Sequence, residues 1–519
     1  MSATRPWPEQ APPLPAASFT ALLAQLRAQA PAAPVLSWRD PADAGSAWAT
    51  WDRQAMADQV DACARRLANG HGLRPGDRVA WLGLNHPAVI VLLFALARLG
   101  AVLVPLNHRL SPAEWRAVLA DCAPRLLVHD ALFTDAARAL AGDGTAALAW
   151  AALGDAGHGA PPPPADAPDA PLLLVYTSGT SGLPKAAVHT QANLLANMAI
   201  AAQVQGLTAD DAVLTVLPLF HVGGLCIQTL PALSVGAHVR LFARFDAAAT
   251  LHSFAHDRPT LTLQVPATLQ ALTAHADWAT TDLNSLRAVW AGSSLLPPAP
   301  LQAFMARGVP VCNVYGSTET GPFSIALPPS HAADHIGSCG WPVPGVEVQL
   351  CDPRGVPVAP GAVGEVWVRG PNVVARYWPD RAATDAEGFF HSGDLGQQAP
   401  DGSFTVVGRA KDMIISGGEN IYPAEIENLI AQHPAVAECS VVGQADARWG
   451  EVTVAVVVLR HAAAHDDWQA ALQAWLDGRL ARYKWPRRWV RLDALPRTAL
   501  GKVKKAELTD LLRTDPAGG

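Results

Sequence analysis

The sequence predicts an α/β protein in which a large N-terminal domain of layered α/β subdomains precedes a small α+β domain. Its 519 residues exceed what one hydrophobic core supports, so about two to four folding units are expected. Up to about residue 310, apolar runs of strand length alternate with helical patterns, which is typical of βαβ units and a mostly parallel sheet. From Gly345 to Gly370, short strands separated by Pro/Gly turns predict a small β-rich subdomain.

The individual elements follow from apolar periodicity and from the Gly and Pro residues that interrupt it. Helices are predicted over residues 51–67, 87–99, 112–120, 191–204, 224–234 and 264–275, and strands over residues 78–82, 101–105, 125–129, 172–175, 212–217 and 286–291. A Pro- and Ala-rich stretch over residues 154–171 is predicted to link two subdomains. The predicted domains are a flexible tail over residues 1–15, a large domain over 16–409 and a small domain over 410–519.

Composition excludes several classes of function. The net charge of −7 and the pI near 6.2 argue against a nucleic-acid partner, which would require a basic face. Seven scattered cysteines without a Cys-x-x-Cys pair indicate neither a disulfide framework nor a zinc site. The apolar stretch over 88–104 contains Arg98 and is shorter than the ~20 residues of a membrane span. We therefore expect a cytoplasmic protein without a membrane span, and a homodimer is left open.

Residues 176–185 read Tyr-Thr-Ser-Gly-Thr-Ser-Gly-Leu-Pro-Lys and follow an apolar run of strand length. Such a loop presents backbone N–H groups and hydroxyls to an anion, and its glycines permit a close approach. Lys185 adds a point positive charge. The loop differs from a Walker motif because Pro184 precedes the lysine and Ala186 follows it. The stretch predicts a phosphate-binding loop, and the alternative is a flexible Gly/Ser turn.

Four further clusters are improbable as background. They are Asn313-Val-Tyr-Gly-Ser-Thr-Glu-Thr-Gly321, His391-Ser-Gly-Asp-Leu395, Gly408-Arg-Ala-Lys-Asp412 continuing to Glu427, and Pro496-Arg-Thr-Ala-Leu-Gly-Lys502. The first stands at the end of a predicted strand, the edge at which α/β folds bind ligands. In their order and spacing, the loop and these clusters resemble the adenylate-forming superfamily of acyl-CoA synthetases, peptide-synthetase adenylation domains and luciferases. The resemblance is closest to bacterial aryl- and medium-chain acyl-CoA ligases and covers residues 45–508.

The resemblance implies a two-step ligase that uses ATP, Mg²⁺ and coenzyme A, with a mobile C-terminal domain. Its ATP and AMP site would comprise Thr177, Ser178, Gly179, Thr180, Ser181, Gly182, Lys185, Gly292, Ser293, Ser294, Asn313, Tyr315, Gly316, Ser317, Thr318, Asp394, Arg409 and Lys502. Glu319, together with Thr180, would ligate Mg²⁺, which prefers oxygen ligands. The catalytic set would be Lys185, His221, Thr318, Glu319 and Lys502.

The resemblance also assigns individual roles. Lys185 would hold the departing pyrophosphate, Tyr315 would lie against adenine, and Asp394 would accept the ribose hydroxyls. Lys502 would bridge the substrate carboxylate and the α-phosphate. Each also has an ordinary explanation: Tyr315 as core, Asp394 as a helix N-cap or turn residue, and Lys502 as a solvated charge.

The stretch over 217–224, Leu-Pro-Leu-Phe-His-Val-Gly-Gly, resembles the acyl-pocket motif of the superfamily. The expected pocket residues are His221, Val222, Gly223, Val265, Gly292, Gly316 and Pro322. Peptide-synthetase domains carry an Asp beside the corresponding aromatic, which binds the substrate ammonium. His221 follows Phe220 here, so the resemblance makes an amino-acid substrate improbable. Small and apolar walls suit a flat aromatic acid of the benzoate or hydroxycinnamate type, and the alternative is a medium-chain fatty acid. His221 could instead be a satisfied core histidine.

For the thioester step, the resemblance implies a hinge at Lys411 and a CoA surface on the small domain. The expected CoA contacts are Gly417, Gly418, Glu419, Trp449, Tyr483 and Arg487. Trp485 occupies a position that is often basic, and these aromatics could instead pack within the domain. The remaining functional alternatives are a stand-alone adenylation enzyme that loads a carrier protein, a luciferase-like oxygenase and a non-enzymatic nucleotide-binding scaffold.

Overall fold

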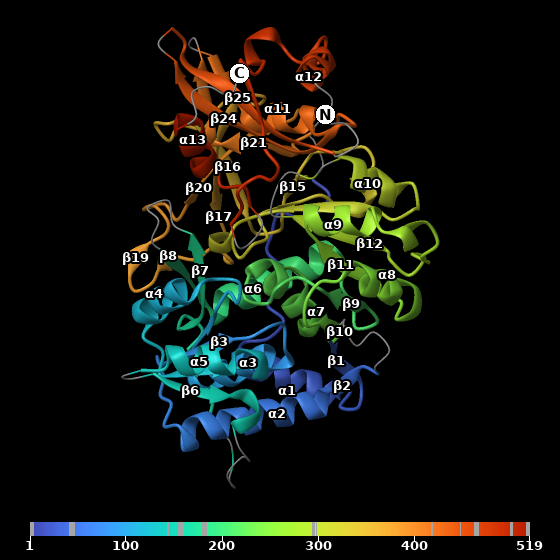
Figure 1. Ribbon diagram of the computed structural model, residues 1–519. Helices are drawn as coiled ribbons and strands as arrows, with labels where there is room; N and C mark the ends of the chain where they lie inside the picture. Colours follow the sequence, from blue (N-terminus) through green and yellow to red (C-terminus); the bar gives the residue numbers. More distant parts are fainter. Residues whose placement is uncertain are drawn as a thin grey trace. The chain divides into compact units, whose positions relative to one another are not determined.

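The structure is a computed structural model. It describes residues 5–40, 47–142, 145–153, 160, 162–165, 167–178, 184–292, 296, 298–416, 419–446, 448–460, 467–498 and 502–514. Contacts between residues divide the chain into two compact units (Figure 1). The first comprises Met1–Leu296, Pro300–Val348 and Trp367–His391, and the second comprises Pro297–Ala299, Gln349–Val366 and Ser392–Gly519. The predicted division after residue 409 falls inside the second unit.

The phosphate-loop sequence lies on an eight-stranded sheet of the first unit, with the order β19-β18-β8-β7-β4-β3-β5-β6. Its strands are β3 (Arg78–Leu82), β4 (Val102–Pro105), β5 (Leu126–His129), β6 (Ala146–Ala149), β7 (Pro171–Ser178), β8 (Pro184–Thr190), β18 (Arg376–Tyr377) and β19 (Arg381–Ala382). β3 pairs with β4 and β5 in parallel, as the alternating pattern predicts. β7 and β8 pair antiparallel, so the loop joins the two strands of a hairpin.

The helices of this region are α2 (Arg53–Arg65), α3 (Pro87–Leu99), α4 (Pro112–Cys122) and α5 (Thr134–Leu140). α3 is buried on all sides except at Arg98, which forms an ion pair with Asp61 at 3.2 Å. The Arg98 Nε also donates to Pro162 O, so the Pro-rich stretch runs along the end of α3. β4, before this stretch in the sequence, and β7, after it, pair directly in the same sheet.

A second, nine-stranded sheet of the first unit has the order β15-β14-β13-β12-β11-β9-β10-β1-β2. Its strands are β1 (Pro34–Arg39), β2 (Ala49–Asp52), β9 (Ala212–Thr215), β10 (His238–Phe242), β11 (Leu261–Gln264), β12 (Ala288–Gly292), β13 (Val311–Tyr315), β14 (Ile325–Ala326) and β15 (Trp341–Pro342). Its helices are α6 (Gln191–Gln205), α7 (Leu230–Ser234), α8 (Ala247–His256), α9 (Pro266–Thr273) and α10 (Pro298–Met305). The helix predicted over 224–234 begins as a π-helical stretch, Gly223–Thr229, before α7.

The N-terminal segment before α1 (Phe19–Gln29) has no helix or strand over residues 5–17. Two hydrogen bonds nevertheless fix it: Trp7 Nε1 donates to Pro342 O at 2.8 Å, and Gly345 N donates to Glu9 O at 2.8 Å. The segment predicted as a flexible tail is therefore anchored at these two residues.

The β-rich region predicted over 345–370 contributes to a four-stranded sheet with the order β16-β17-β20-β21. Its strands are β16 (Glu347–Cys351), β17 (Val363–Arg369), β20 (Phe390–Gln398) and β21 (Phe404–Arg409). A further sheet of the second unit comprises β22 (Ile414–Ser416), β23 (Glu419–Ile421), β24 (Val436–Asp446), β25 (Gly450–Leu459) and β26 (Arg488–Arg491). The helices of that unit are α11 (Pro423–Ile430), α12 (Trp468–Leu476) and α13 (Lys505–Thr514).

These elements confirm the predicted α/β class, with several sheets in a large N-terminal part and a smaller α+β C-terminal part. Among the described residues, no helix is both long enough and apolar enough to cross a bilayer.

Candidate active site

The two strands of the phosphate-loop hairpin bring Thr177 and Lys185 opposite each other. Thr177 Oγ1 donates to the Lys185 carbonyl at 3.3 Å. Of the other loop residues, Ser178 is described by its backbone only, and Gly179, Thr180, Ser181 and Gly182 lie outside the described residues. The hairpin thus fixes the position from which the Lys185 side chain emerges.

Lys185, Tyr377 and Glu319 form one hydrogen-bonded cluster. Lys185 Nζ donates to Tyr377 OH at 2.6 Å, and Tyr377 OH donates to Glu319 Oε1 at 2.7 Å. The ammonium also lies 3.3 Å from Glu319 Oε1 and 4.1 Å from the centre of the Tyr377 ring. This arrangement follows from strand pairing: Tyr377 pairs with Ala187 on β8, so it is the diagonal neighbour of Lys185 on the same face.

The electrostatics of this cluster keep Glu319 ionised although its side chain is only 8% exposed. Burial by itself would raise the pKa of Glu319, but the hydrogen bond from Tyr377 and the charge of Lys185 outweigh it and leave the pKa below its usual value. Burial, followed by the Glu319 charge, raises the pKa of Tyr377, so its hydroxyl stays protonated. Nearby on β8, burial lowers the pKa of His189 to about 4, which leaves that ring neutral.

The predicted adenine and α-phosphate residues follow one another at the end of β13. Asn313 donates through Nδ2 to Ser338 O at 3.1 Å, and Tyr315 is half-buried. A Cβ on Gly316 would lie 1.7 Å from Pro322 O, so the chain can pass there only as glycine. Ser317, Thr318 and Glu319 then form a tight turn in which Ser317 N donates to Thr320 Oγ1.

The predicted acyl-pocket residues come from several elements of the first unit. Gly292 ends β12 beside β13, and a Cβ there would lie 2.7 Å from Val314 O. His221 is half-buried, and its Nδ1 accepts a hydrogen bond from Gly223 N at 3.0 Å. Val222 and Pro322 are buried, while Val265 is half-buried at the start of α9. Ser293 and Ser294 lie outside the described residues.

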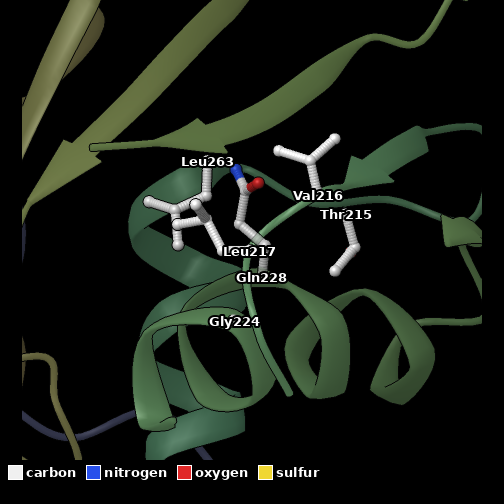
Figure 2. Close-up of a pocket in the computed structure, with 6 residues that line it drawn as sticks. All are labelled: Thr215, Val216, Leu217, Gly224, Gln228 and Leu263. Carbon is white, nitrogen blue, oxygen red and sulfur yellow. The ribbon is translucent and has the colours of Figure 1, made fainter. Parts of the chain in front are cut away.

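A small pocket lies next to the His221 segment (Figure 2). It is lined by Thr215, Val216, Leu217, Gly224, Gln228 and Leu263. Leu217 and Gly224 bound the predicted acyl-pocket stretch at its two ends.

In the second unit, Asp394 and Arg409 lie on paired strands, β20 and β21. Arg409 Nε lies 2.9 Å from Asp394 Oδ1, and the carboxylate side chain is 14% exposed. Asp394 does not cap a helix, because it lies within β20. Its backbone N–H donates to Ser392 Oγ. The pair is preformed, as an ion pair between neighbouring strands.

Three other predicted residues of the second unit, Lys411, Glu419 and Lys502, are exposed. Lys411 lies in a 3-10 turn, Ala410–Asp412, and Glu419 begins β23. Lys502 is exposed, with its backbone held to Thr498 on both sides. Gly417 and Gly418 lie outside the described residues.

The expected CoA-facing aromatics have different environments. The Arg487 guanidinium stacks over the half-buried Trp449 ring at 4.4 Å, and Tyr483 is 46% exposed. Trp485 instead donates through Nε1 to Leu480 O and packs against the core of the small domain. Trp485 therefore packs within the small domain, which was the alternative to a CoA contact. Trp449 and Tyr483 retain accessible ring surface.

Two residues of the first unit that sequence reasoning missed organise the site. Tyr377 holds Glu319 and Lys185, and Asn372 donates through Nδ2 to Thr320 O and Phe323 O at 2.6 and 2.8 Å. Neither residue belongs to one of the sequence motifs or stands at a diagnostic spacing from them. A tyrosine followed by Trp-Pro stands out in a chain with five tyrosines, but it does not indicate its partner.

The comparisons with known proteins identify the family of the chain. Residues 24–378 match the family of AMP-binding enzymes, and residues 425–502 match the AMP-binding enzyme C-terminal domain. The indoleacetate–CoA ligase of Aromatoleum aromaticum is 45% identical over 480 residues, which cover 89% of this chain and 94% of that protein. The feruloyl-CoA synthase of an Amycolatopsis species is 43% identical over 449 residues, which cover 85% and 91%.

A solved structure of the o-succinylbenzoate–CoA synthetase of Bacillus subtilis, in complex with ATP and a magnesium ion, is similar with a TM-score of 0.84. It is 31% identical, and the match covers 94% of this chain and 99% of that one. The chain therefore belongs to the AMP-binding enzymes and is an adenylate-forming acid–thiol ligase.

Proposed function

We propose that this ligase joins an aromatic carboxylic acid to coenzyme A in two steps. The carboxylate attacks the α-phosphate of ATP to give acyl-AMP and pyrophosphate, and the CoA thiol then displaces AMP to give the thioester. The observation that carries the proposal is the cluster of Lys185, Glu319 and Tyr377 beside the phosphate-loop hairpin. The cluster supplies a fixed cation and an ionised carboxylate, and a polyanion that binds with Mg²⁺ needs both.

The described residues fit ATP with Mg²⁺. Glu319 is a buried carboxylate held in its ionised form, and it offers the hard oxygen that Mg²⁺ prefers. Ser317 Oγ, two residues earlier, is buried, and no described group hydrogen-bonds to it. Among the described residues no cluster of three or more His, Cys, Asp and Glu side chains forms a metal cage. A single protein carboxylate suits an ion that arrives with the substrate phosphates and neutralises their charge.

The roles of the side chains in the first step follow from charge. An anionic carboxylate approaches a polyanionic phosphate, so catalysis consists mainly of positioning and charge neutralisation. Lys185 would neutralise the leaving pyrophosphate, with Tyr377 fixing its ammonium. Asp394, held by Arg409, would accept hydrogen bonds from the ribose hydroxyls. Lys502 would bridge the substrate carboxylate and the α-phosphate, between which the new bond forms.

The aromatic substrate class is supported by relatives and by the pocket. The two ligases described above are named for indoleacetate and for a feruloyl product, both of which carry aromatic rings. The walls expected here are small or apolar, including Gly223, Val222 and Gly292. Small or apolar walls suit a flat ring.

A panel of carboxylic acids tests the function. We expect AMP release that depends on both the acid and CoA, with benzoates, hydroxycinnamates and indoleacetate ahead of medium-chain aliphatic acids. Pyrophosphate exchange without acyl-CoA would instead indicate a carrier protein as the thiol partner. An aliphatic acid as the best substrate would contradict the proposed class.

Cytoplasmic location and a homodimer belong to the same proposal. Cell fractionation with detection of the chain tests the first, and light scattering of the purified protein tests the second.

A further inference from the structure

The pocket beside the His221 segment is apolar apart from two side chains. Val216, Leu217 and Leu263 line it with hydrocarbon, and Thr215 and Gln228 are its polar lining residues. Figure 2 shows the amide of Gln228 among them. In this conformation the pocket has no room for a water molecule between its walls. The hydrogen-bonding state of these two side chains therefore decides what the pocket can bind.

The orientation of the Gln228 amide is fixed by Gln205. Gln205 Nε2 donates to two backbone carbonyls, Ile227 O at 2.7 Å and Ala201 O at 3.2 Å. This leaves Gln205 Oε1 as the acceptor, and Gln228 Nε2 donates to it at 2.9 Å. Turning either amide over would set oxygen against oxygen. Gln228 must therefore direct its own carbonyl oxygen elsewhere.

That oxygen has no partner among the described residues, although Gln228 is only 2% exposed. In Figure 2 the amide of Gln228 reaches from its helical segment toward the strand that carries Leu263. A buried acceptor without a donor is unfavourable, and natural folds seldom leave one in a core position.

Thr215 is also restricted to accepting. Thr229 Oγ1 donates to Gly224 O at 2.6 Å, so its proton is used there. The 3.0 Å contact between Thr215 and Thr229 must then use the Thr215 proton. Thr215 thus offers lone pairs and no free proton, and the carbonyl oxygen of Gln228 still lacks a donor, so a ligand that brings a donor would satisfy it.

We infer that Gln228 selects aromatic acids that carry an N–H or O–H donor on the ring system, such as an indole N–H or a phenolic O–H. The inference rests on the proposed function and specifies its substrate. The pocket shares Leu217 and Gly224 with the predicted acyl-pocket stretch, in which they flank His221, Val222 and Gly223. A ring edge that parts the apolar walls satisfies Gln228 Oε1, whereas an analogue without the donor buries that oxygen unpaired.

The test compares matched pairs of acids on the purified full chain. One pair is indole-3-acetate and benzofuran-3-acetate, and the other is 4-hydroxycinnamate and 4-methoxycinnamate. The ratio of kcat/KM values for acid-dependent AMP release is expected to favour the donor by about tenfold or more in at least one pair. In Gln228→Met, which keeps the length but removes the acceptor, that ratio is expected to fall to within about twofold of unity.

Gln264→Met is the matched control. Gln264 is equally buried and also has an oxygen without a described partner, but it follows Leu263 on β11, so its side chain points to the opposite face of the strand. The control is expected to keep the wild-type ratio. Loss of the ratio in Gln264→Met but not in Gln228→Met would overturn the inference.

The wild-type comparison stands even if a variant fails to fold. Activation of all four acids without preference in either pair would overturn the inference and leave the proposed function intact. Failure of every aromatic acid to release AMP would overturn both.

Discussion

At the scale of single residues, Tyr377 allows a nearly buried carboxylate to stay charged beside a lysine. Its hydroxyl accepts from Lys185 and donates to Glu319, so one group orders both partners. Lys185 and Glu319 could be predicted from their motifs, because each lies within a run of diagnostic residues. Tyr377 could not, since its contact with Glu319 spans 58 residues of sequence and depends on the pairing of β18 with β8.

Tyr377→Phe tests this role. Loss of a hydrogen bond to a charged group costs about 1.5–3 kcal/mol, so we expect lower stability near pH 7 and roughly tenfold slower acid-dependent pyrophosphate exchange. Glu319 has a folded pKa below its unfolded value, so its ionisation stabilises the fold above that unfolded value and ceases to do so as the pH falls through the folded pKa. The variant brings the two pKa values closer together.

The stability gap between wild type and Tyr377→Phe should therefore be largest near pH 7 and should shrink as the pH falls below about 4.5. Thermal unfolding over this pH range measures it. Tyr176→Phe is the control, because Tyr176 donates to the exposed carboxylate of Asp121 rather than to a buried one. A gap that does not change with pH would refute the role assigned to Tyr377.

At the scale of elements, the sequence predicts regular segments well and the π-helical stretch, Gly223–Thr229, only in part. α3 and β3 have the predicted bounds, because Pro87 and Gly100 limit the helix and an uninterrupted apolar run forms the strand. The segment over 224–234 has helical periodicity, but its first part is π-helical, and there Gly224 lies close to the backbone of Pro218. Such an approach depends on tertiary packing and leaves no periodic signal.

Gly316→Ala tests the turn after β13. The added Cβ would meet Pro322 O at 1.7 Å, and because both groups are backbone-bound, neither can rotate away. We expect a loss of about 3 kcal/mol in stability and strongly reduced pyrophosphate exchange. Thermal unfolding and exchange assays measure both. Gly70→Ala, where no atom lies within 4 Å of the new Cβ, should behave as wild type, and equal behaviour of the two variants would contradict the close approach.

At the scale of the whole molecule, the two units divide the proposed machinery. Lys185, Glu319 and Tyr377 belong to the first unit, while Asp394, Arg409 and Lys502 belong to the second. The proposed reaction needs residues of both units in its first step and a CoA-facing surface of the second unit in its second step. This division predicts that the two half-reactions can be impaired separately.

Lys411→Pro tests the predicted hinge. Proline fixes φ near −65° and would restrict the change of backbone conformation that a hinge residue undergoes. We expect pyrophosphate exchange close to that of wild type and thioester formation at least about tenfold slower, measured with supplied acyl-AMP and CoA. Lys411→Ala removes the same charge without fixing φ, so it should retain both activities.

Lys502→Ala provides the opposite pattern. Without its cation the first step should be lost, while conversion of supplied acyl-AMP and CoA to the thioester continues. Because Lys502 is exposed, its replacement should leave the unfolding temperature unchanged, which separates a chemical effect from loss of folding. Equal loss of both half-reactions in Lys411→Pro would remove the hinge assignment, and equal loss in Lys502→Ala would remove the role of that lysine in the first step alone.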